Sequence, residues 1–235
     1  MYLDFLERSN ETEWMDHPDI DQKELNTALN DISRVNRLLG GNRITIKAVF
    51  DRLNKLNIES PVIIDLGCGD GEMLRLLADE ARKQKKSLKL IGVDISEKCI
   101  VRAKNLSSTY PEISYIAGDL RMLDPADFSC SILICTLTLH HLSDSQIIEI
   151  VNKSLSLVSD SVIINDLHRS KIAFVLFKLV SLFLIRSKVA RHDGLVSIKR
   201  SFIQDDFLKY IKHFKINRYQ IKWKWAFRFE WILVK

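Results

Sequence analysis

The chain has 235 residues, of which 46% are hydrophobic and 28% charged, with a formal net charge of +5 and a pI of about 9.0. With only eight Gly and four Pro, this composition indicates a globular protein with one sizeable core and excludes a low-complexity chain. The Lys and Arg residues are scattered, apart from clusters over 82–86 and 186–200, which favours solvated helix faces over a surface for nucleic acid or an anionic membrane.

The first part of the chain, residues 1–57, is predicted to form a helical cap with helices over 1–14, 25–39 and 44–56. Apolar side chains recur every three or four residues in the second and third of these helices, which is the helical period. Gly40 and Gly41 separate them, because glycine ends helices readily.

From Pro61 onward, short apolar runs alternate with helical patterns. Strands are predicted over 62–64, 88–93, 113–117, 132–137 and 162–165, and helices over 72–84, 97–106 and 146–158. This alternation predicts right-handed βαβ units and a parallel sheet with helices on both faces. A helix over 207–214 and a single strand over 223–231, with its aromatic residues on a buried face, are predicted to end the chain.

The four cysteines show neither a Cys-x-x-Cys pair nor a Cys/His metal pattern. Each lies in or beside an apolar run, where a free thiol packs as a small hydrophobic group. The N-terminus carries several acids and no apolar signal region. These features predict a cytoplasmic protein with free thiols and no metal site.

The strongest motif is the segment VIIDLGCGDG from Val62 to Gly71, which joins a predicted strand to a predicted helix. Glycines at such a turn let the backbone approach a ligand closely. The spacing differs from the GxGxxG fingerprint of dinucleotide sites, and Asp70 puts a negative charge where a pyrophosphate would lie. We therefore expect a cofactor that carries positive charge.

Two further acids follow the next strands. Asp94 ends the second predicted strand, where a carboxylate can accept hydrogen bonds from ribose hydroxyls. Asp119 follows the third strand, where a carboxylate can accept from the amino group of adenine. A single such acid is often only a capping residue. Together with Asp65 at the end of the first strand, however, Asp94 and Asp119 place acids at three successive strand ends, which is a specific pattern.

At these residues the sequence resembles the class I S-adenosylmethionine-dependent methyltransferases, over residues 61–166. The resemblance implies an α/β fold, a doubly wound Rossmann-like sheet of seven strands with the last strand antiparallel, over 58–235. It implies S-adenosylmethionine as the cofactor. The family's Phe-Asp at the start of the fourth strand is replaced here by Cys130-Ser131. The implied cofactor-binding residues are Asp65, Gly67, Cys68, Gly69, Gly71, Asp94, Ile95, Gly118, Asp119, Leu120 and Thr136.

The fourth strand continues into Leu139-His140-His141-Leu142, which resembles the ubiquinone and menaquinone biosynthesis methyltransferases. These enzymes mostly act on small molecules and lipids. His140, His141 and Asp166 are the candidate catalytic residues, since a histidine at this edge can act as a general base. The alternative is that the histidines cap and pack the loop.

A lid-like insertion is predicted over 169–202. Its apolar part, 172–185, is too short to span a bilayer. It is predicted to cover the acceptor site as a helix; a buried core helix and an interfacial membrane helix are the alternatives. The candidate substrate-binding residues are His168, Arg169, Phe174, His192 and Arg200.

The predicted function is methyl transfer to a small hydrophobic acceptor, on oxygen or carbon. Three alternatives are weaker. A nucleic-acid methyltransferase lacks its Asn/Asp-Pro-Pro-aromatic motif here, and Thr136-Leu137-Thr138-Leu139 stands in that place. The intact glycines and three intact acids weigh against a non-catalytic cofactor-binding protein, and Asp70 and the glycine spacing weigh against a nicotinamide oxidoreductase.

Overall fold

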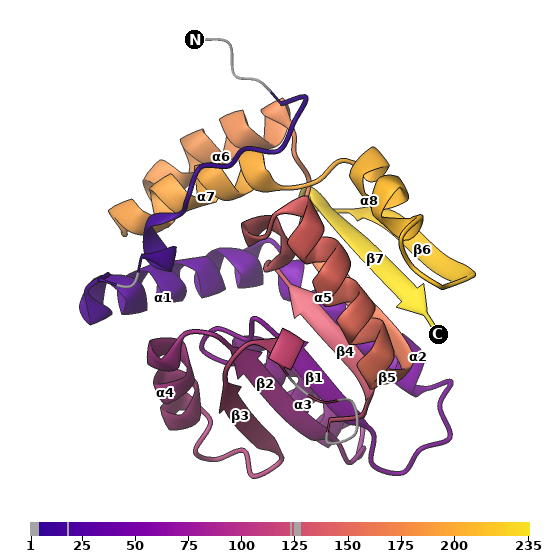
Figure 1. Cartoon of the computed structure of the whole chain (residues 1–235). Helices are drawn as coiled ribbons and strands as arrows, with labels where there is room; N and C mark the ends of the chain where they lie inside the picture. The colour runs from indigo at the N-terminus through magenta and orange to yellow at the C-terminus, as the bar shows by residue number, and fades with distance from the viewer. Residues whose placement is uncertain (1–4, 18, 123, 125–127) are drawn as a thin grey trace.

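The computed structural model describes residues 5–17, 19–122, 124 and 128–235. Its centre is a seven-stranded sheet with the order β3-β2-β1-β4-β5-β7-β6 (Figure 1). Five strands are parallel: β1 (Val62–Leu66), β2 (Lys89–Asp94), β3 (Ile113–Ala117), β4 (Cys130–Thr136) and β5 (Val158–Leu167). β7 (Arg228–Val234) runs antiparallel to both β5 and β6 (Arg218–Lys224). The predicted fold class is confirmed.

The two faces of the sheet bury different side chains because neighbouring residues of a strand point in opposite directions. Ile63 and Ile132 pack toward a layer that contains α2 (Gly41–Leu53), α3 (Glu72–Lys83) and α4 (Glu97–Leu106). Ile64 and Leu133 pack toward the opposite layer, which contains α5 (Asp144–Leu157) and α8 (Gln204–Ile211). The sheet is therefore the middle of three layers, and its buried strands are almost continuously apolar, as parallel strands are.

A helical cap covers the carboxyl edge of the parallel strands. It consists of α1 (Gln22–Leu38), α6 (Lys171–Leu184), α7 (Lys188–Arg200) and the N-terminal segment, defined here as residues 5–17 (Figure 1). Asp31 of α1 accepts hydrogen bonds from the backbone N–H groups of Arg186 and Ser187, both at 2.7 Å. Because these groups precede α7, Asp31 fixes the start of that helix against α1.

Two predicted elements at the ends of the chain are wrong. Residues 223–231 form parts of two strands, β6 and β7, joined by a turn, and Trp223 and Trp225 are exposed while Trp231 is buried. The alternating pattern runs through the turn because no Gly or Pro interrupts it. Residues 5–13 form no helix; the segment runs along α7, where the Ser9 N–H donates to the Lys199 carbonyl at 3.1 Å.

The apolar run 172–185 forms a helix, α6, directly after β5 as predicted, but α6 is the outermost element of the cap. It packs on α7, and α7 in turn contacts the turn that carries the two histidines. One side of α6 faces outward with these apolar residues exposed: Ile172, Val175, Leu176, Leu179, Val180, Leu182 and Phe183. Among the described residues no helix is long and apolar enough to cross a membrane.

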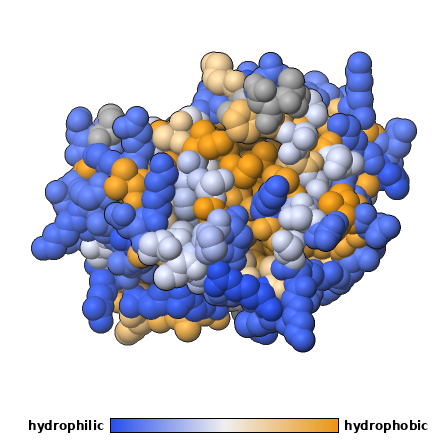
Figure 2. All heavy atoms as spheres, turned by 90° about the horizontal axis from the view of Figure 1, so that it is seen from below, coloured by the Kyte–Doolittle hydropathy of each residue, from blue (hydrophilic) through white to orange (hydrophobic). Residues whose placement is uncertain are grey.

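The opposite side of the molecule has a different surface. Figure 2 views it from below, away from α6 and α7, and shows hydrophobic atoms gathered near the centre of that face with hydrophilic ones around them. The exposed apolar side chains of α6 therefore form a separate surface at the other end of the molecule.

Candidate active site

The glycine turn after β1 is built for close approach of a ligand. The N–H groups of Gly67 and Cys68 donate to the Val93 carbonyl at 2.8 and 3.2 Å, which ties the turn to the end of β2. Gly67 has φ +70° and a Cβ there would overlap with the side chain of Thr138. Gly69 has φ +53°, and a Cβ there would meet nothing within 4 Å. The space above Gly69 is thus open to a ligand.

Two buried acids lie beside this turn. Asp94 accepts a hydrogen bond from the Gly69 N–H at 2.8 Å and another from the Ser96 N–H at 2.9 Å. Asp65 is 2% exposed, and burial together with the charge of Asp94 raises its pKa well above the usual value. Burial also raises the pKa of Asp94. Among the described residues no Lys or Arg is paired with either acid, so the site favours a ligand that carries positive charge.

The residues at this turn fit S-adenosylmethionine. Its ammonium and sulfonium groups would compensate the two buried carboxyls, and its ribose hydroxyls would find an acceptor in Asp94. The open turn at Gly69 leaves room for the cofactor next to the backbone. The residues that would hold it are Asp65, Asp94 and the glycines of the turn.

Asp70 does not present the uncompensated negative charge that the sequence predicted. Its carboxylate is 3.4 Å from an Arg75 nitrogen and 3.2 Å from an Arg102 nitrogen, and it also accepts from the Glu72 N–H. Two guanidinium groups therefore compensate its charge. The prediction that Asp70 would repel a pyrophosphate is therefore wrong. The preference for a cationic ligand comes from Asp65 and Asp94.

The other predicted cofactor residues have varied surroundings. Ile95 is 80% exposed beside Asp94, as expected for a residue that could cover a ligand, and Gly118 has open space where a Cβ would stand. Asp119 accepts hydrogen bonds from Arg121, so an adenine would have to share this carboxylate. Leu120 is buried, and the Thr136 hydroxyl is 3.0 Å from that of Thr45 in α2, which turns it away from the open turn.

The two histidines lie at the same sheet edge, in the short 3₁₀ helix Leu139–His141 that follows β4. His140 is 3% exposed, and its Nδ1 is hydrogen-bonded to Asp166 of β5 at 2.7 Å. The His140 N–H also donates to Asp166, at 3.3 Å. The structure thus brings together all three candidate catalytic residues, with Asp166 fixing the ring of His140. Their catalytic role stays a prediction.

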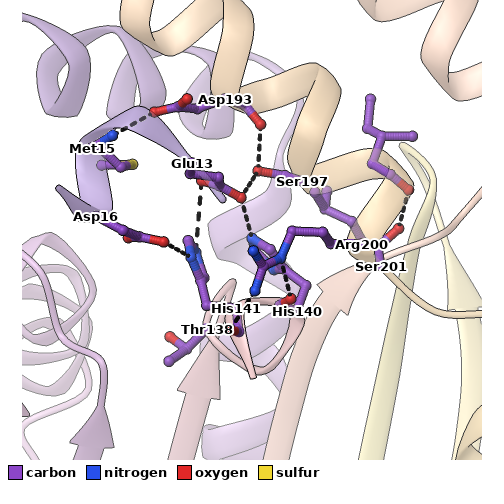
Figure 3. Close-up of polar contacts among 12 residues, drawn as sticks. Glu13, Met15, Asp16, Thr138, His140, His141, Asp193, Ser197, Arg200 and Ser201 are labelled. Atoms are coloured by element: carbon purple, nitrogen blue, oxygen red, sulfur yellow. Dashed lines mark hydrogen bonds and ion pairs between the residues drawn. The ribbon is translucent and has the colours of Figure 1, made fainter. Parts of the chain in front are cut away.

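The N-terminal segment adds two acids that the sequence analysis missed (Figure 3). Asp16 is hydrogen-bonded to Nδ1 of His141 at 2.9 Å. Glu13 is buried, with its Oε1 3.5 Å from Nε2 of His140 and its Oε2 3.9 Å from Nε2 of His141. Ser197 of α7 donates to Glu13 at 2.7 Å. The one signal in the sequence was the number of acids in the N-terminal segment.

The electrostatics of this group are coupled. Burial opposes a charge on His140, but Asp166 and Glu13 outweigh it and raise the pKa of His140 to about 9. Burial acts against the carboxylate forms of Asp166 and Glu13 too, yet the histidines hold the pKa of each below its usual value. The raised pKa of His140 therefore favours a positive charge on its ring between these carboxylates. Among the described residues, Glu13, His140 and His141 also have ligand atoms close enough together to share a metal ion.

The predicted substrate-binding residues are mostly occupied by contacts within the protein. Arg169 is buried and donates to Asp206 at 3.0 Å and to three main-chain carbonyls, which gives it a structural role instead. Arg200 donates to the carbonyls of His140, His141 and Glu11, so it fixes the histidine turn. Neither guanidinium is placed to clamp an acidic substrate.

The three remaining candidates for substrate binding have different surroundings. His168 receives a hydrogen bond from Trp223 at 3.2 Å and lies with the hairpin of β6 and β7. Phe174 is buried among apolar residues of the cap. His192 stacks on Trp14 with ring centroids 3.8 Å apart, next to the segment that supplies Glu13. Of the three, His192 is the one that contacts the N-terminal segment, which also carries Glu13 and Asp16.

Comparisons with known proteins agree with this geometry. Residues 63–160 match the family model described as "Methyltransferase domain". No curated protein matches the chain. The plantazolicin methyltransferase in complex with SAH has a TM-score of 0.69 and 18% identity, covering 94% of this chain and 92% of that chain. Magnesium protoporphyrin IX methyltransferase from Synechocystis PCC 6803 with bound SAH has a TM-score of 0.57 and 20% identity, covering 83% and 84%.

The family match confirms the predicted enzyme class for the region that carries the glycine turn, Asp94 and Asp119. The solved neighbours share the fold, and those proteins contain bound SAH or SAM. Neither comparison reaches the finer resemblance to the ubiquinone and menaquinone methyltransferases. The cap, which contributes Glu13 and Ser197, lies outside the matched residues.

Proposed function

We propose that this chain, whose residues 63–160 match a methyltransferase domain, transfers the methyl group of S-adenosylmethionine to a small hydrophobic acceptor. The acceptor we favour is aromatic, quinone-like or lipid-linked and is methylated on oxygen or carbon, as the resemblance to ubiquinone and menaquinone methyltransferases implies. The solved neighbours are named for a porphyrin and for plantazolicin, which supports a small molecule or a peptide as the acceptor.

The observation that carries the proposal is the pair of buried carboxyls, Asp65 and Asp94, beside an open glycine turn. Leaving such groups buried without a cation costs free energy, and sites of this kind are retained where a ligand supplies the missing charge. When bound, S-adenosylmethionine supplies an electrophilic methyl group on a sulfonium. The residues of the chain hold and orient it, because methyl transfer is an in-line displacement that depends mainly on alignment.

The acceptor side of the site is formed by the histidine turn and the cap. The interior of the cap is apolar, with Ala28, Val189 and Ala190 buried and Met15 and Ile20 packed against them. Burial of apolar surface would therefore contribute to acceptor binding. The cap also excludes water from the edge of the sheet, which protects the sulfonium and strengthens electrostatic contacts there.

The first test is Asp94→Ala. Loss of charge-assisted hydrogen bonds to a ribose costs on the order of 2–4 kcal/mol, so we expect the affinity for SAH to fall at least tenfold. Isothermal titration calorimetry on the purified protein measures it. Asp51→Ala is the matched control, since Asp51 is an exposed acid of α2 paired with Lys47. Wild-type protein that binds NADH and ignores SAH would overturn the proposal.

We also propose that the outward side of α6 contacts a lipid surface. Seven exposed apolar side chains lie on this helix, and the exposed bases Lys171, Lys178, Arg186 and Lys188 lie on or next to it. The helix contains no acidic residue. An apolar side with basic residues around it is typical of interfacial helices on anionic membranes. Such a contact would suit a lipid-linked acceptor.

A further inference from the structure

We propose that Glu13, His140 and His141 bind one divalent metal ion of the zinc class on the acceptor side of the site. The three side chains each offer one ligand atom, and these atoms all lie within 4.8 Å of one another. Two imidazole nitrogens and one carboxylate oxygen are a donor set that Zn²⁺ uses with an open fourth position. This inference deepens the proposed function. A role of the ion in methyl transfer would rest on that proposed function, whereas metal binding does not depend on it.

The separations within the triple are those of ion pairs and are longer than ordinary hydrogen bonds. Nε2 of His140 is 3.5 Å from one oxygen of Glu13, and Nε2 of His141 is 3.9 Å from the other. Both separations exceed the roughly 2.7–3.2 Å that is usual between the heavy atoms of a hydrogen bond. A tetrahedral ion with bonds of about 2.0–2.1 Å separates its ligand atoms by about 3.3–3.4 Å. Because the two contacts use different oxygens of Glu13, the side chains would have to draw together for three ligand atoms to reach this separation.

The outer nitrogen of each ring is already held by a carboxylate. Asp166 is 2.7 Å from Nδ1 of His140, and Asp16 is 2.9 Å from Nδ1 of His141. This leaves Nε2 of both rings directed at Glu13, whose own orientation is fixed by the Ser197 hydroxyl at 2.7 Å. Metal-binding histidines almost always donate their other N–H to a carboxylate, carbonyl or water, and here both rings have a carboxylate.

The surroundings also favour a cation. Three carboxyl groups, those of Glu13, Asp16 and Asp166, contact the two imidazoles. Asp193 instead pairs with His192 at 2.8 Å and accepts from two backbone N–H groups of the N-terminal segment at 2.8 and 2.9 Å. The described guanidinium groups at the histidine turn, those of Arg8 and Arg200, donate there to main-chain carbonyls and not to these carboxylates. His141 is partly exposed, with 24% of its side chain accessible. The open position would therefore lie on its side, where water or an acceptor oxygen can reach the ion.

The test is metal binding by the full chain, without any acceptor. Chelator-treated protein is titrated with Zn²⁺, and Co²⁺ serves as a spectroscopic substitute because tetrahedral Co²⁺ absorbs strongly in the visible range. We expect one ion per chain. His141→Ala, which removes the more exposed ligand, should weaken Zn²⁺ binding at least about 100-fold, and Asp16→Asn should weaken it roughly 10-fold.

Matched controls are Glu11→Gln, an acid of the same segment paired with Lys199, and His213→Ala, an exposed histidine after α8. Both should bind Zn²⁺ like the wild type, and circular dichroism checks that each variant folds. Wild-type protein that binds no ion, or binds it equally after His141→Ala, would overturn the inference. SAH calorimetry on the same samples separates the outcomes, because SAH binding without metal binding leaves the proposed function intact.

Discussion

Asp65 is a buried carboxyl that the free protein holds without a cationic partner among the described residues. Its pKa is raised by burial, so the folded state binds the proton more tightly than the unfolded chain. Its contribution to stability therefore falls as pH rises above about 3.9, the value in an unfolded chain. The residue that would attract the cofactor is thus a source of instability when the cofactor is absent.

We predict that Asp65→Asn stabilises the free protein at neutral pH and weakens the cofactor. Removing an uncompensated buried charge should gain roughly 1–3 kcal/mol, and each kcal/mol raises Tm by about 2–4 °C in a protein of this size. The difference in Tm between variant and wild type should grow from pH 4 to pH 8. SAH affinity should fall at least tenfold. A variant with a lower Tm at pH 7.5, or with unchanged SAH affinity, contradicts the argument.

Asp65 and Asp94 could be predicted from sequence because each lies at the end of a strand that its own neighbours define. Glu13 and Asp16 could not, since their partners are more than 120 residues away and the intervening chain has to fold first. Arg169 failed for the reverse reason. Its position after β5 suggested a ligand, but only the fold shows that Asp206 and main-chain carbonyls occupy it.

The two helices of the cap that follow β5 touch at a glycine. Gly194 of α7 lies against the ring of Phe177 in α6, and a Cβ at this position would overlap with that ring. The close approach places α7 where Ser197 can reach Glu13. The packing of α6 on α7 is therefore coupled to the geometry of the histidine cluster.

We predict that Gly194→Ala destabilises the protein although alanine favours helices. Helix propensity would give a gain of up to about 1 kcal/mol, but overpacking costs about 1–3 kcal/mol. Tm should drop by a few degrees. Phe177→Leu makes room, so the double variant should lose less than the sum of the two single variants. A rise in Tm for Gly194→Ala alone would show that α6 and α7 separate freely.

Element types in the α/β region were predictable because each strand and helix there has its own period. β3 and α4 were predicted with their observed bounds, and β5 was found although it is longer than predicted. The hairpin of β6 and β7 was missed because its turn, with Phe227 at φ +53°, contains neither Gly nor Pro. α7 was missed because its apolar residues are few and lie between basic ones.

A membrane contact through α6, as proposed above, would fix the orientation of the whole molecule. α6 and the cap lie at one end, above the carboxyl edge of the sheet where the candidate site is (Figure 1). A bilayer in contact with α6 would therefore lie on the side from which a lipid-linked acceptor approaches. The body of the α/β domain would remain in water on the other side (Figure 2).

We predict that the protein sediments with vesicles of phosphatidylglycerol and much less with phosphatidylcholine, because the basic residues near α6 attract anionic lipid. The double variant Leu179→Ser, Phe183→Ser should reduce binding at least tenfold, since each large apolar side chain contributes roughly 1.5–3 kcal/mol when buried. Ile58→Ser is the control, an exposed apolar residue outside the cap. Equal binding by the double variant and the control would assign the apolar side of α6 to another contact.

The N-terminal segment also determines when the candidate site can exist during synthesis. Glu13 and Asp16 leave the ribosome early, but Ser197, which fixes Glu13, is made 184 residues later. Domains generally fold as units in the order in which they are synthesised, and the strands that carry Asp65 and Asp94 precede α7. The residues of the cofactor side are therefore all synthesised before α7. The N-terminal segment is therefore translated long before the partner that fixes Glu13 exists.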